Sequence, residues 1–462
     1  MNVDKLFEDA MLAQQKGLLD DALDLFAAVI LNKPTHSAAW HMRGLVEDRA
    51  GRPFNALVHL NQSCALESHQ AVWCNRGVIA GKLQLYDEAV ASFNKALEFG
   101  HAYEPYQNMG DYYIRMGKLE EAAKSYRAAI KCKPNEHGAH ENLGRVLIAM
   151  GQWNLGYREI YWRHKAEFKP WERLTYPCWE GQPLKDKTIV VYPEGGYGDE
   201  ILDTRYAMLL KARNLNARVV LEARPAMYAL SKYSLTGLEV IPQYEDPSGA
   251  VDYTVGISDL PQFLNLCGDN IPYTEGYLLV PPGPKPLLPP GLKVGLCWLT
   301  GKRPLQKWTD RVQKAKSIPL HQFSSLFENK EVTFISLQLD RADPTVMRKI
   351  GMFNPMDNVR DLADTARIME QLDLVIGVDT SVTHLAGALR IPCWNLIRFD
   401  EIATYPGRLN FYDSMTFYRQ TEPDNWNPII DKLTRDFERW VDSKSDARST
   451  SPAPSVAAEA AE

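Results

Sequence analysis

The amino-acid sequence predicts an α-helical solenoid followed by two α/β halves, each built on a parallel sheet. Two observations lead to this fold class. Small and aromatic residues recur every 33 or 34 residues over the first third of the chain, and after residue 171 short apolar runs alternate with helical patterns. A fixed period of this length is typical of stacked helical hairpins. Strands that alternate with helices are typical of parallel sheets covered on both faces.

The period appears in two registers. Steps of 34, 33, 33 and 34 residues separate the small residues Ala10, Gly44, Gly77, Gly110 and Gly144. In the second register an alanine precedes a larger apolar or aromatic residue by four positions, in the pairs Ala22 and Phe26, Ala56 and Leu60, Ala89 and Phe93, and Ala122 and Tyr126. We interpret each period as two antiparallel helices, in which the small residue allows close approach and the larger side chain fills the groove.

Turn and stop signals lie at matching places in the repeats. The expected turns contain Gly17, Gly51, Gly117 and Gly151, and the expected helix ends precede Pro34 and Pro134. Proline ends a helix because it cannot continue the hydrogen-bond ladder. Four repeats fit residues 5–137, and a fifth starts near 139 and departs from the pattern at "GQWNLGYREIYWRHK".

The pattern resembles the tetratricopeptide repeat, so residues 1–165 are expected to form a curved solenoid. The concave face of such a solenoid usually holds a protein or peptide. The alternative is that the solenoid only pads or dimerises the rest of the chain, and self-association stays open.

The remainder divides at a proline-rich segment. The runs "TIVVYP", "ARVVLEA", "GLEVIP" and "DYTVG" are the expected strands of a first Rossmann-like domain at 175–280, and "LKVGLCW", "VTFISLQL" and "LDLVIGV" belong to a second at 292–440. Between them, "PPGPKPLLPPG" at 281–291 is too rich in proline for a helix or strand and is expected to be a semi-rigid linker. The segment 442–462 is small, polar and without periodicity, so we expect disorder there.

Composition excludes several classes of protein. The formal net charge is -6 and the pI about 6.0, which argues against a nucleic-acid partner or an anionic membrane surface. Seven cysteines form no C-x-x-C pair or zinc-like cluster with the histidines, so reduced thiols and no metal site are expected. The N-terminus carries Asp4, Glu8 and Asp9 where a secretory signal needs a basic start, and no apolar stretch reaches membrane-spanning length. The expected location is cytoplasmic.

Three glycines follow the first expected strand, in "VVYPEGGYGDEILDTRY": Gly195, Gly196 and Gly198. Ligands of open parallel sheets bind at the carboxyl ends of the strands. Glycines between a strand and a helix let a ligand approach backbone N–H groups near the positive end of the helix. The G-x-G-x-x-G fingerprint is not met, and the alternative is that these glycines serve tight turns alone.

A second loop, "DTSVTH", joins the strand "LDLVIGV" to the helix "THLAGAL" and carries Asp379, Thr380, Ser381 and His384. A helix cap needs only Asp379 or Thr380. The excess of polar groups indicates an anionic diphosphate on the helix end, with hydroxyls and an imidazole as further donors. The alternative for His384 is a structural role.

Both loops, in this order and in two halves, resemble the family 9 glycosyltransferases of the heptosyltransferase type. The similarity is closer still to bacterial proteins that join tetratricopeptide repeats to such a domain, and it extends to about Trp440. It is carried by "GYGDEILDTRY", "GLCW", "SIPL", "SLQ" and, most specifically, "DTSVTHLAGALRIPCW". This resemblance implies the GT-B fold, a nucleotide-sugar donor bound by the C-terminal domain, and no metal or other cofactor.

The resemblance also implies roles for single residues. Asp379, Thr380, Ser381 and His384 are expected at the donor, with Thr300 and Lys302 as partners of its diphosphate. Lys307 and Lys316 lie in the same basic segment, "GKRPLQKWTDRVQKAK", and cannot be ranked against Lys302 by sequence. Asp199 matches the family's proposed general base, which would deprotonate the acceptor hydroxyl.

The sequence also contains alternatives to these roles. Asp199 would otherwise only cap the helix that follows it. Glu200 departs from the family pattern, and its charge would repel an anionic donor unless the side chain points away. The expected function is transfer of a sugar from a nucleotide sugar to a protein held by the repeats. The alternatives are a transferase that acts on a surface-polysaccharide precursor and a scaffold with an inactive transferase domain.

Overall fold

The computed structural model describes residues 2–165, 176–301, 315–339, 343–401 and 411–450. The chain forms two compact units, residues 1–168 and 169–462. The predicted Lys302 and Lys307 lie outside the described residues.

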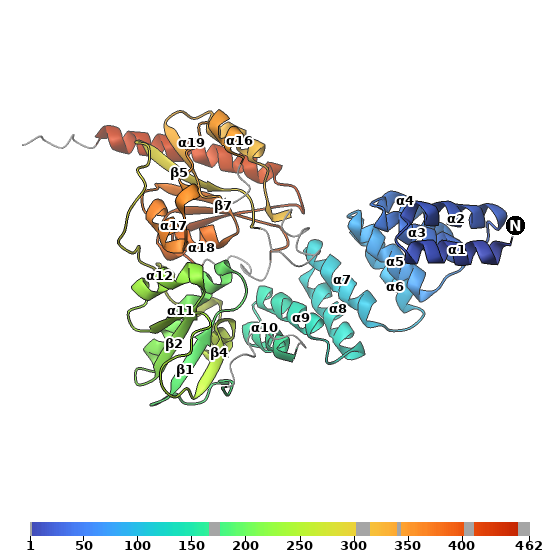
Figure 1. Ribbon diagram of the computed structural model, residues 1–462, viewed down its shortest axis with the longest axis horizontal. Coiled ribbons are helices and arrows are strands. Elements are labelled where there is room, and N and C mark those ends of the chain that lie inside the picture. The colour runs from blue at the N-terminus through green and yellow to red at the C-terminus, as the bar shows by residue number, and fades with distance from the viewer. Residues whose placement is uncertain (1, 166–175, 302–314, 340–342, 402–410, 451–462) are drawn as a thin grey trace, which may run out of the picture. The chain divides into compact units, whose positions relative to one another are not determined.

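The first unit is a stack of antiparallel helix pairs, drawn in blue to cyan in Figure 1. Its described helices are α1 (Val3–Gln15), α2 (Leu19–Asn32), α3 (Ser37–Arg49), α4 (Pro53–Leu66), α5 (Gln70–Lys82), α6 (Tyr86–Leu97), α7 (Tyr103–Arg115), α8 (Leu119–Cys132), α9 (His137–Ala149), α10 (Trp153–Ile160) and the 3-10 turn η1 (Tyr161–Lys165). The predicted period is confirmed. The helices that precede Pro34 and Pro134 end at Asn32 and Cys132.

The two sequence registers meet inside each helix pair. A methyl group on Gly77 would lie 2.7 Å from the Phe93 ring, and one on Gly110 would lie 2.5 Å from the Tyr126 ring. Real Cβ atoms essentially never make such contacts, so glycine is required at these two positions. The small residue therefore sets how closely the two helices approach, as the spacing predicts.

The turns and the fifth repeat show how the pattern tolerates change. Gly117, in the turn between α7 and α8, has a left-handed φ of +71°. Gln84, at the same place one repeat earlier, adopts φ 63° without being glycine. In the fifth repeat, Gly156 takes the alanine position and packs against Gly144, whose added Cβ would lie 2.6 Å from the carbonyl oxygen of Gly156. The departing sequence thus still forms a helix pair, with a short second helix.

The second unit begins with a four-stranded parallel sheet in the order β3-β2-β1-β4 (Figure 1). Its strands are β1 (Thr188–Tyr192), β2 (Arg218–Ala223), β3 (Glu239–Pro242) and β4 (Tyr253–Gly256). The accompanying helical elements are α11 (Tyr197–Arg213), α12 (Pro225–Ser234), η2 (Ile257–Asp259), α13 (Leu260–Phe263) and η3 (Gly268–Asn270). All four strands are among the predicted runs.

The C-terminal half of this unit holds a five-stranded parallel sheet in the order β6-β5-β7-β8-β9. Its strands are β5 (Leu292–Cys297), β6 (Val332–Ser336), β7 (Leu374–Val378), β8 (Cys393–Ile397) and β9 (Met415–Arg419). Its helical elements are η4 (Leu320–Phe323), α15 (Ser324–Phe327), α16 (Pro344–Lys349), η5 (Met356–Asn358), α17 (Leu362–Met369), α18 (Ser381–Ala388) and α19 (Asn427–Thr450). The sequence did not predict β9, which extends the sheet beside β8.

A shared apolar core joins the two halves of the second unit. It runs from Ile189 and Val191 of β1 to Val375 of β7 and Leu385 of α18. Between the sheets, α11 packs on α18 and α12 packs on α17. A second core on the other face of the C-terminal sheet includes Phe437 of α19. Because the first core crosses from one half to the other, the loops at the sheet edges are held in a defined relation.

The end of the chain differs from the expectation in one respect. Disorder was predicted from residue 442, but α19 continues to Thr450, and residues 451–462 lie outside the described part. The predicted tail fails over 442–450 because α19 carries the apolar residues Phe437 and Val441, which anchor the helix in the core just before the polar segment begins.

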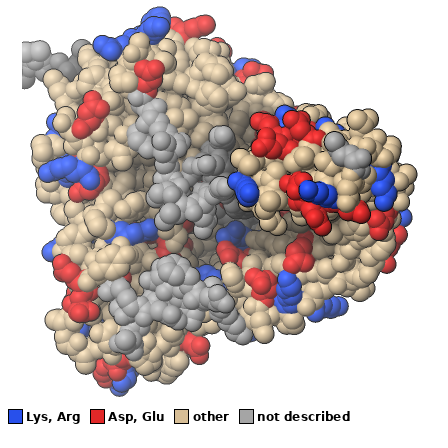
Figure 2. All heavy atoms as spheres, turned by 45° about the vertical axis from the view of Figure 1, so that its right-hand side comes forward, with Lys and Arg blue, Asp and Glu red and all other residues tan. Residues whose placement is uncertain are grey.

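The surface charges and the hydropathy of the described helices agree with what the composition of the sequence indicates. On the face that Figure 2 shows, acidic and basic side chains lie among one another. Of the helices that the structure describes, none is both long and apolar enough to cross a membrane.

Candidate functional site

The glycine loop, residues 194–199 between β1 and α11, is closed by its own aspartate. The backbone N–H of Gly196 donates to Oδ2 of Asp199 at 2.6 Å. Gly195 has a φ of +65°, and a methyl group there would lie 2.5 Å from that oxygen. Gly195 is therefore needed for the turn itself, and Asp199 caps α11, as the alternative interpretation of both features predicts.

Arg224, at the end of β2, holds the outer side of the same loop. Its guanidinium donates to the carbonyl oxygens of Glu194, Gly195 and Gly196 at 3.3, 3.0 and 2.8 Å. It also pairs with the buried carboxylate of Glu200. Burial raises the pKa of Glu200, and Arg224 opposes this shift. Glu200 thus points into the protein toward a cation, which removes the charge conflict that its position in the sequence raises.

The second loop, residues 379–384, lies between β7 and α18. The side chain of Thr383 closes the helix end, because its Oγ1 accepts the N–H of Thr380 at 3.3 Å. Oδ2 of Asp379 accepts from Nζ of Lys316 at 3.2 Å, and its Oδ1 accepts from Nδ2 of Asn395 at 3.4 Å. The carboxylate of Asp379 therefore does more than a helix cap requires, because it binds both Lys316 and Asn395.

Lys316 is a buried cation at this edge of the sheet. Its Nζ lies 2.7 Å from Oε2 of Glu401 as well as 3.2 Å from Asp379. Burial alone would lower the pKa of Lys316, but Glu401 and Asp379 raise it above its ordinary value, so the amine stays charged. Thr300 joins the group through the hydroxyl of Ser317, 3.4 Å from its own. Lys316, the basic residue of this segment that the structure describes, lies at the site.

The two loops face each other inside the second unit. A methyl group on Gly198 would lie 3.1 Å from Cδ2 of His384 and 3.5 Å from the backbone nitrogen of Ser381. In Figure 1, α11 and α18 lie next to each other between the two sheets. A glycine at position 198 therefore allows the second loop to come this close.

His384 is buried between polar partners on both sides of its ring. Nε2 lies 3.6 Å from Oδ1 of Asp379, and Nδ1 lies 3.4 Å from the hydroxyl of Tyr412. Burial lowers the pKa of His384, while the charges of Asp379 and Asp199 oppose this shift. A neutral imidazole at neutral pH follows, with one nitrogen able to donate and one able to accept.

A second carboxyl group lies one helical turn after Asp199. Asp203 accepts a hydrogen bond of 2.7 Å from the hydroxyl of Ser258. Burial raises the pKa of Asp203 to about 8, and the charges of Asp199 and Glu194 add to the shift. Asp203 therefore keeps its proton at neutral pH, and its carboxyl group lies on the same face of α11 as that of Asp199.

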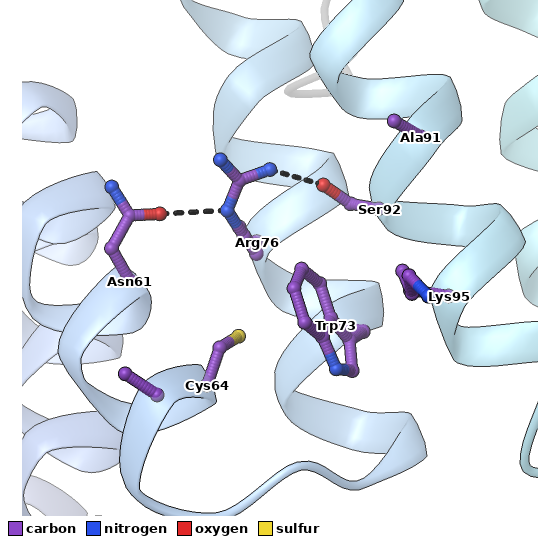
Figure 3. Close-up of a pocket in the computed structure, with 8 residues that line it drawn as sticks. Asn61, Cys64, Trp73, Arg76, Ala91, Ser92 and Lys95 are labelled. Carbon is purple, nitrogen blue, oxygen red and sulfur yellow. Dashed lines mark hydrogen bonds between the residues drawn. The ribbon is translucent and has the colours of Figure 1, made fainter.

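A further hollow, of about 480 Å³, belongs to the first unit and contains none of the predicted site residues. Figure 3 shows Arg76 of α5 between Asn61 of α4 and Ser92 of α6, with the indole of Trp73 beside it. Nε of Arg76 donates to Oδ1 of Asn61 at 2.7 Å, and Nε1 of Trp73 donates to the hydroxyl of Ser68 at 2.6 Å. These bonds fix the walls of the hollow in place.

Sequence reasoning found both loops but missed most of their partners. The residues it missed are Asp203, Arg205, Arg224, Asn395, Glu401 and Tyr412. Asp203 and Arg205 lie within "GYGDEILDTRY" but no spacing set them apart there, and the other four lie in no glycine-rich or hydroxyl-rich motif. The one available signal was Arg224, which directly follows a predicted strand and so belongs at the carboxyl edge of the sheet, where ligands bind. Among the described residues, no group of three or more His, Cys, Asp or Glu has an arrangement that could hold a metal ion.

Comparison with known proteins supports the repeats. Residues 71–99 match the family model of the tetratricopeptide repeat, and residues 110–151 match a model described as TPR repeat. The chain thus contains tetratricopeptide repeats. It is 24% identical over 412 residues to Protein FlbA of Caulobacter vibrioides, and the match covers 79% of this chain and 66% of FlbA, just under two thirds of its length.

Solved structures are similar to about a third of the chain. MamA is 18% identical, with coverage of 34% of this chain and 93% of MamA and a TM-score of 0.33. YrrB, described as a TPR protein with an unusual peptide-binding site, is 16% identical, with coverage of 34% of this chain and 82% of YrrB and a TM-score of 0.32.

Proposed function

We propose that this protein is a glycosyltransferase that moves a sugar from a nucleotide-sugar donor to a protein or peptide held by the repeats. The observation that carries the proposal is the meeting of the glycine loop with the Asp379–His384 loop at facing edges of two parallel sheets. Ligands of such sheets bind outside the carboxyl ends of the strands. In this proposal the donor binds on one side of the meeting point and the acceptor on the other.

The donor is assigned to the C-terminal half. Ser381 begins α18, whose first N–H groups carry the positive end of the helix dipole. Lys316 supplies a fixed positive charge beside it, and Asp379 and His384 supply groups suited to sugar hydroxyls. Together these features fit a nucleotide sugar, in which a diphosphate is joined to a hydroxyl-rich ring. The helix end and Lys316 would stabilise the leaving diphosphate without a metal ion.

The acceptor is assigned to the side of the glycine loop. Asp199 is the residue proposed to take the proton from the acceptor hydroxyl. Its Oδ2 accepts the N–H of Gly196, which fixes the side chain in place. Asp203, one turn away, already carries a proton at neutral pH, so it does not compete with Asp199 for the proton of the acceptor.

One observation favours a second function, a scaffold without catalysis. The charge of Lys316 is already balanced by two carboxylates, Asp379 and Glu401, which leaves less positive potential for a diphosphate. In this case the repeats would bind a partner protein and the second unit would be a pocket that no longer transfers sugar.

Thermal-shift binding separates the two functions. The wild type is compared with His384→Ala against a panel of nucleoside diphosphates and nucleotide sugars, with and without EDTA. His321→Ala is the control, because His321 is an exposed histidine in the same half. A ligand that binds only the folded state raises Tm by mass action. We expect one nucleotide sugar to stabilise the wild type and the control but not His384→Ala.

Transfer is then tested with Asp199→Asn. Loss of sugar transfer with unchanged donor binding would support the base assignment, and transfer at the wild-type rate would refute it. If no member of the panel stabilises the wild type, the scaffold replaces the enzyme as the function.

A further inference from the structure

We propose that Tyr412 is a positioning residue that holds His384 as the neutral tautomer with its proton on Nε2. Nε2 is the nitrogen that faces Asp379, at 3.6 Å, and it lies 3.7 Å from the place of a Cβ on Gly198. The opposite nitrogen, Nδ1, lies 3.4 Å from the hydroxyl of Tyr412. The use of this tautomer in donor binding rests on the proposed function, whereas the tautomer itself follows from the hydrogen bond to Tyr412 and the carboxylate that faces Nε2.

The placement of protons begins at Tyr277. Its hydroxyl donates to the carbonyl oxygen of Ile201. A phenol has a single proton, so the oxygen of Tyr277 is left as an acceptor toward Tyr412, whose hydroxyl lies 3.4 Å away. Among the described residues, the oxygen of Tyr277 and Nδ1 of His384 both lie within hydrogen-bond distance of the Tyr412 hydroxyl.

The Asp379 carboxylate selects between them. If Tyr412 donated to Tyr277, Nδ1 of His384 would carry the imidazole proton and Nε2 would turn a lone pair toward Oδ1 of Asp379. A lone pair that faces a carboxylate in a buried site is repelled. With the proton on Nε2, the imidazole instead donates toward Asp379 while Nδ1 accepts from Tyr412. Asp379, His384 and Tyr412 then each face a group of complementary polarity.

Arg205 of α11 holds Tyr412 in place. Its fully buried guanidinium lies 4.6 Å from the Tyr412 ring and 4.9 Å from the Tyr277 ring. It also donates to the carbonyl oxygen of Phe411 at 2.8 Å, which anchors the residue before Tyr412. A cation over the faces of both rings restricts their orientation. The hydroxyl that contacts His384 in the C-terminal half is thus fixed by a helix of the N-terminal half.

The charged groups around His384 agree with a neutral ring. Burial lowers the pKa of His384 most, Asp379 and Asp199 oppose the shift, and Arg205 and Lys316 add to it. A neutral imidazole with Nε2–H toward the facing loops is a hydrogen-bond donor that carries no charge. Such a donor suits an oxygen of the nucleotide sugar, and it keeps the same direction whether or not Asp379 moves to a ligand.

Two conservative variants test the assignment, Tyr412→Phe and Tyr277→Phe. Both remove one hydroxyl from the same pair of rings, but only Tyr412 contacts His384. The tautomer is measured without any ligand, by long-range ¹H–¹⁵N spectra of the ¹⁵N-histidine-labelled chain. The His384 signals among those of the ten histidines are assigned from the spectrum of His384→Ala.

We expect the wild type and Tyr277→Phe to show His384 as the Nε2–H tautomer alone. Tyr412→Phe should show a measurable share of the Nδ1–H tautomer, because the bias from Asp379, 3.6 Å from Nε2, then acts without the hydrogen bond from Tyr412. The proposal is overturned if the wild type carries the proton on Nδ1, a result that needs no variant to fold. It is also overturned if Tyr412→Phe keeps one tautomer, or if Tyr277→Phe becomes mixed as well.

Donor binding is measured separately. With the nucleotide sugar that stabilises the wild type, Tyr412→Phe is expected to raise Kd about five- to tenfold relative to Tyr277→Phe, the effect of one misdirected hydrogen bond. Equal Kd values for the two variants would overturn the link between the tautomer and the donor. If no nucleotide sugar binds the wild type, the proposed function fails while the ligand-free tautomer is still decided by the spectra.

Discussion

Gly198 of α11 and His384 of α18 face each other where these two helices pack between the sheets of the second unit. The space between them holds the hydrogen atom of glycine but is too tight for a methyl group unless a neighbour shifts. The Cβ of an alanine at position 198 would lie 3.1 Å from Cδ2 of His384. The ring cannot easily move away, because it is held between Asp379 and Tyr412. The close contact therefore couples the position of the glycine loop to the orientation of the imidazole.

Gly198→Ala is expected to displace His384 while changing the free energy of unfolding by less than about 1 kcal/mol. The added methyl group crowds the imidazole, but alanine also favours α11 by up to about 1 kcal/mol. The His384 ring signals should shift, and affinity for any stabilising nucleotide sugar should fall. Gly237→Ala is the control, because a Cβ there has no heavy atom within 4 Å. Identical His384 signals in Gly198→Ala and the wild type would contradict the coupling.

Arg224→Met is expected to destabilise the second unit by about 3–5 kcal/mol, because Glu200 would be left as a buried charge without its cation. The double variant Arg224→Met, Glu200→Gln should recover much of this loss, since it removes the charge as well. Urea unfolding of the single and double variants measures both values. If the double variant is as unstable as Arg224→Met, the hydrogen bonds from Arg224 to the loop carbonyl oxygens, and not the ion pair, stabilise this region.

Gly110→Ala is expected to destabilise the solenoid by about 1–3 kcal/mol, the usual cost of an overpacked contact. Its Cβ would lie 2.5 Å from the Tyr126 ring, whose hydroxyl is tied to Asp111 by a 2.6 Å hydrogen bond. In Gly138→Ala the nearest atom is 3.5 Å away, so this helical control should be neutral or stabilising by up to about 1 kcal/mol. Denaturant unfolding of the first unit's signal compares them, and equal losses in the two variants would contradict the packing.

Asp111 makes the stability of the solenoid depend on pH. Burial raises its pKa to about 6 from 3.8, although the hydrogen bond from Tyr126 and the charge of Arg115 oppose the shift. Because the folded state binds the proton more tightly than the unfolded state, the stabilisation is complete below about pH 4 and is lost as the pH rises to about 6.

Asp111→Asn removes the titrating group and retains an oxygen that can accept from Tyr126. Relative to the wild type it should gain on the order of 1–2 kcal/mol between pH 4 and pH 7.5. The measurement is the free energy of unfolding of both proteins across this range. A difference between the two proteins that does not change with pH would show that Asp111 titrates normally.

The periodic features of this chain were predictable because they depend on residues close together in sequence. The glycine-to-aromatic spacing in each repeat, such as Gly110 and Tyr126, encodes a helix pair without reference to the rest of the chain. Each apolar run before β9 was identified as a strand from its own composition. The strand β9 was missed because "MTFYR" has a polar residue exposed and no flanking glycine signal, and its pairing with β8 stabilises it.

The contacts within the site depend on distant parts of the chain. The sequence placed Asp379 and His384 at a strand end, but Lys316, Glu401 and Tyr412 reach them from other loops. Arg205 meets the carbonyl of Phe411 across 206 positions of sequence. Asp199 could be either a cap or a base by sequence, and the structure shows its bond to Gly196.

Secondary structure thus follows largely from local residue patterns, because turn chemistry and periodicity act over a few residues. The direction of a buried proton or a lysine charge follows from the groups that folding brings within hydrogen-bond distance. Those groups are chosen by the packing of α11 against α18, which buries polar side chains that must then find partners. No local sequence pattern encodes which groups become partners, because they come together only when the two sheets share one core.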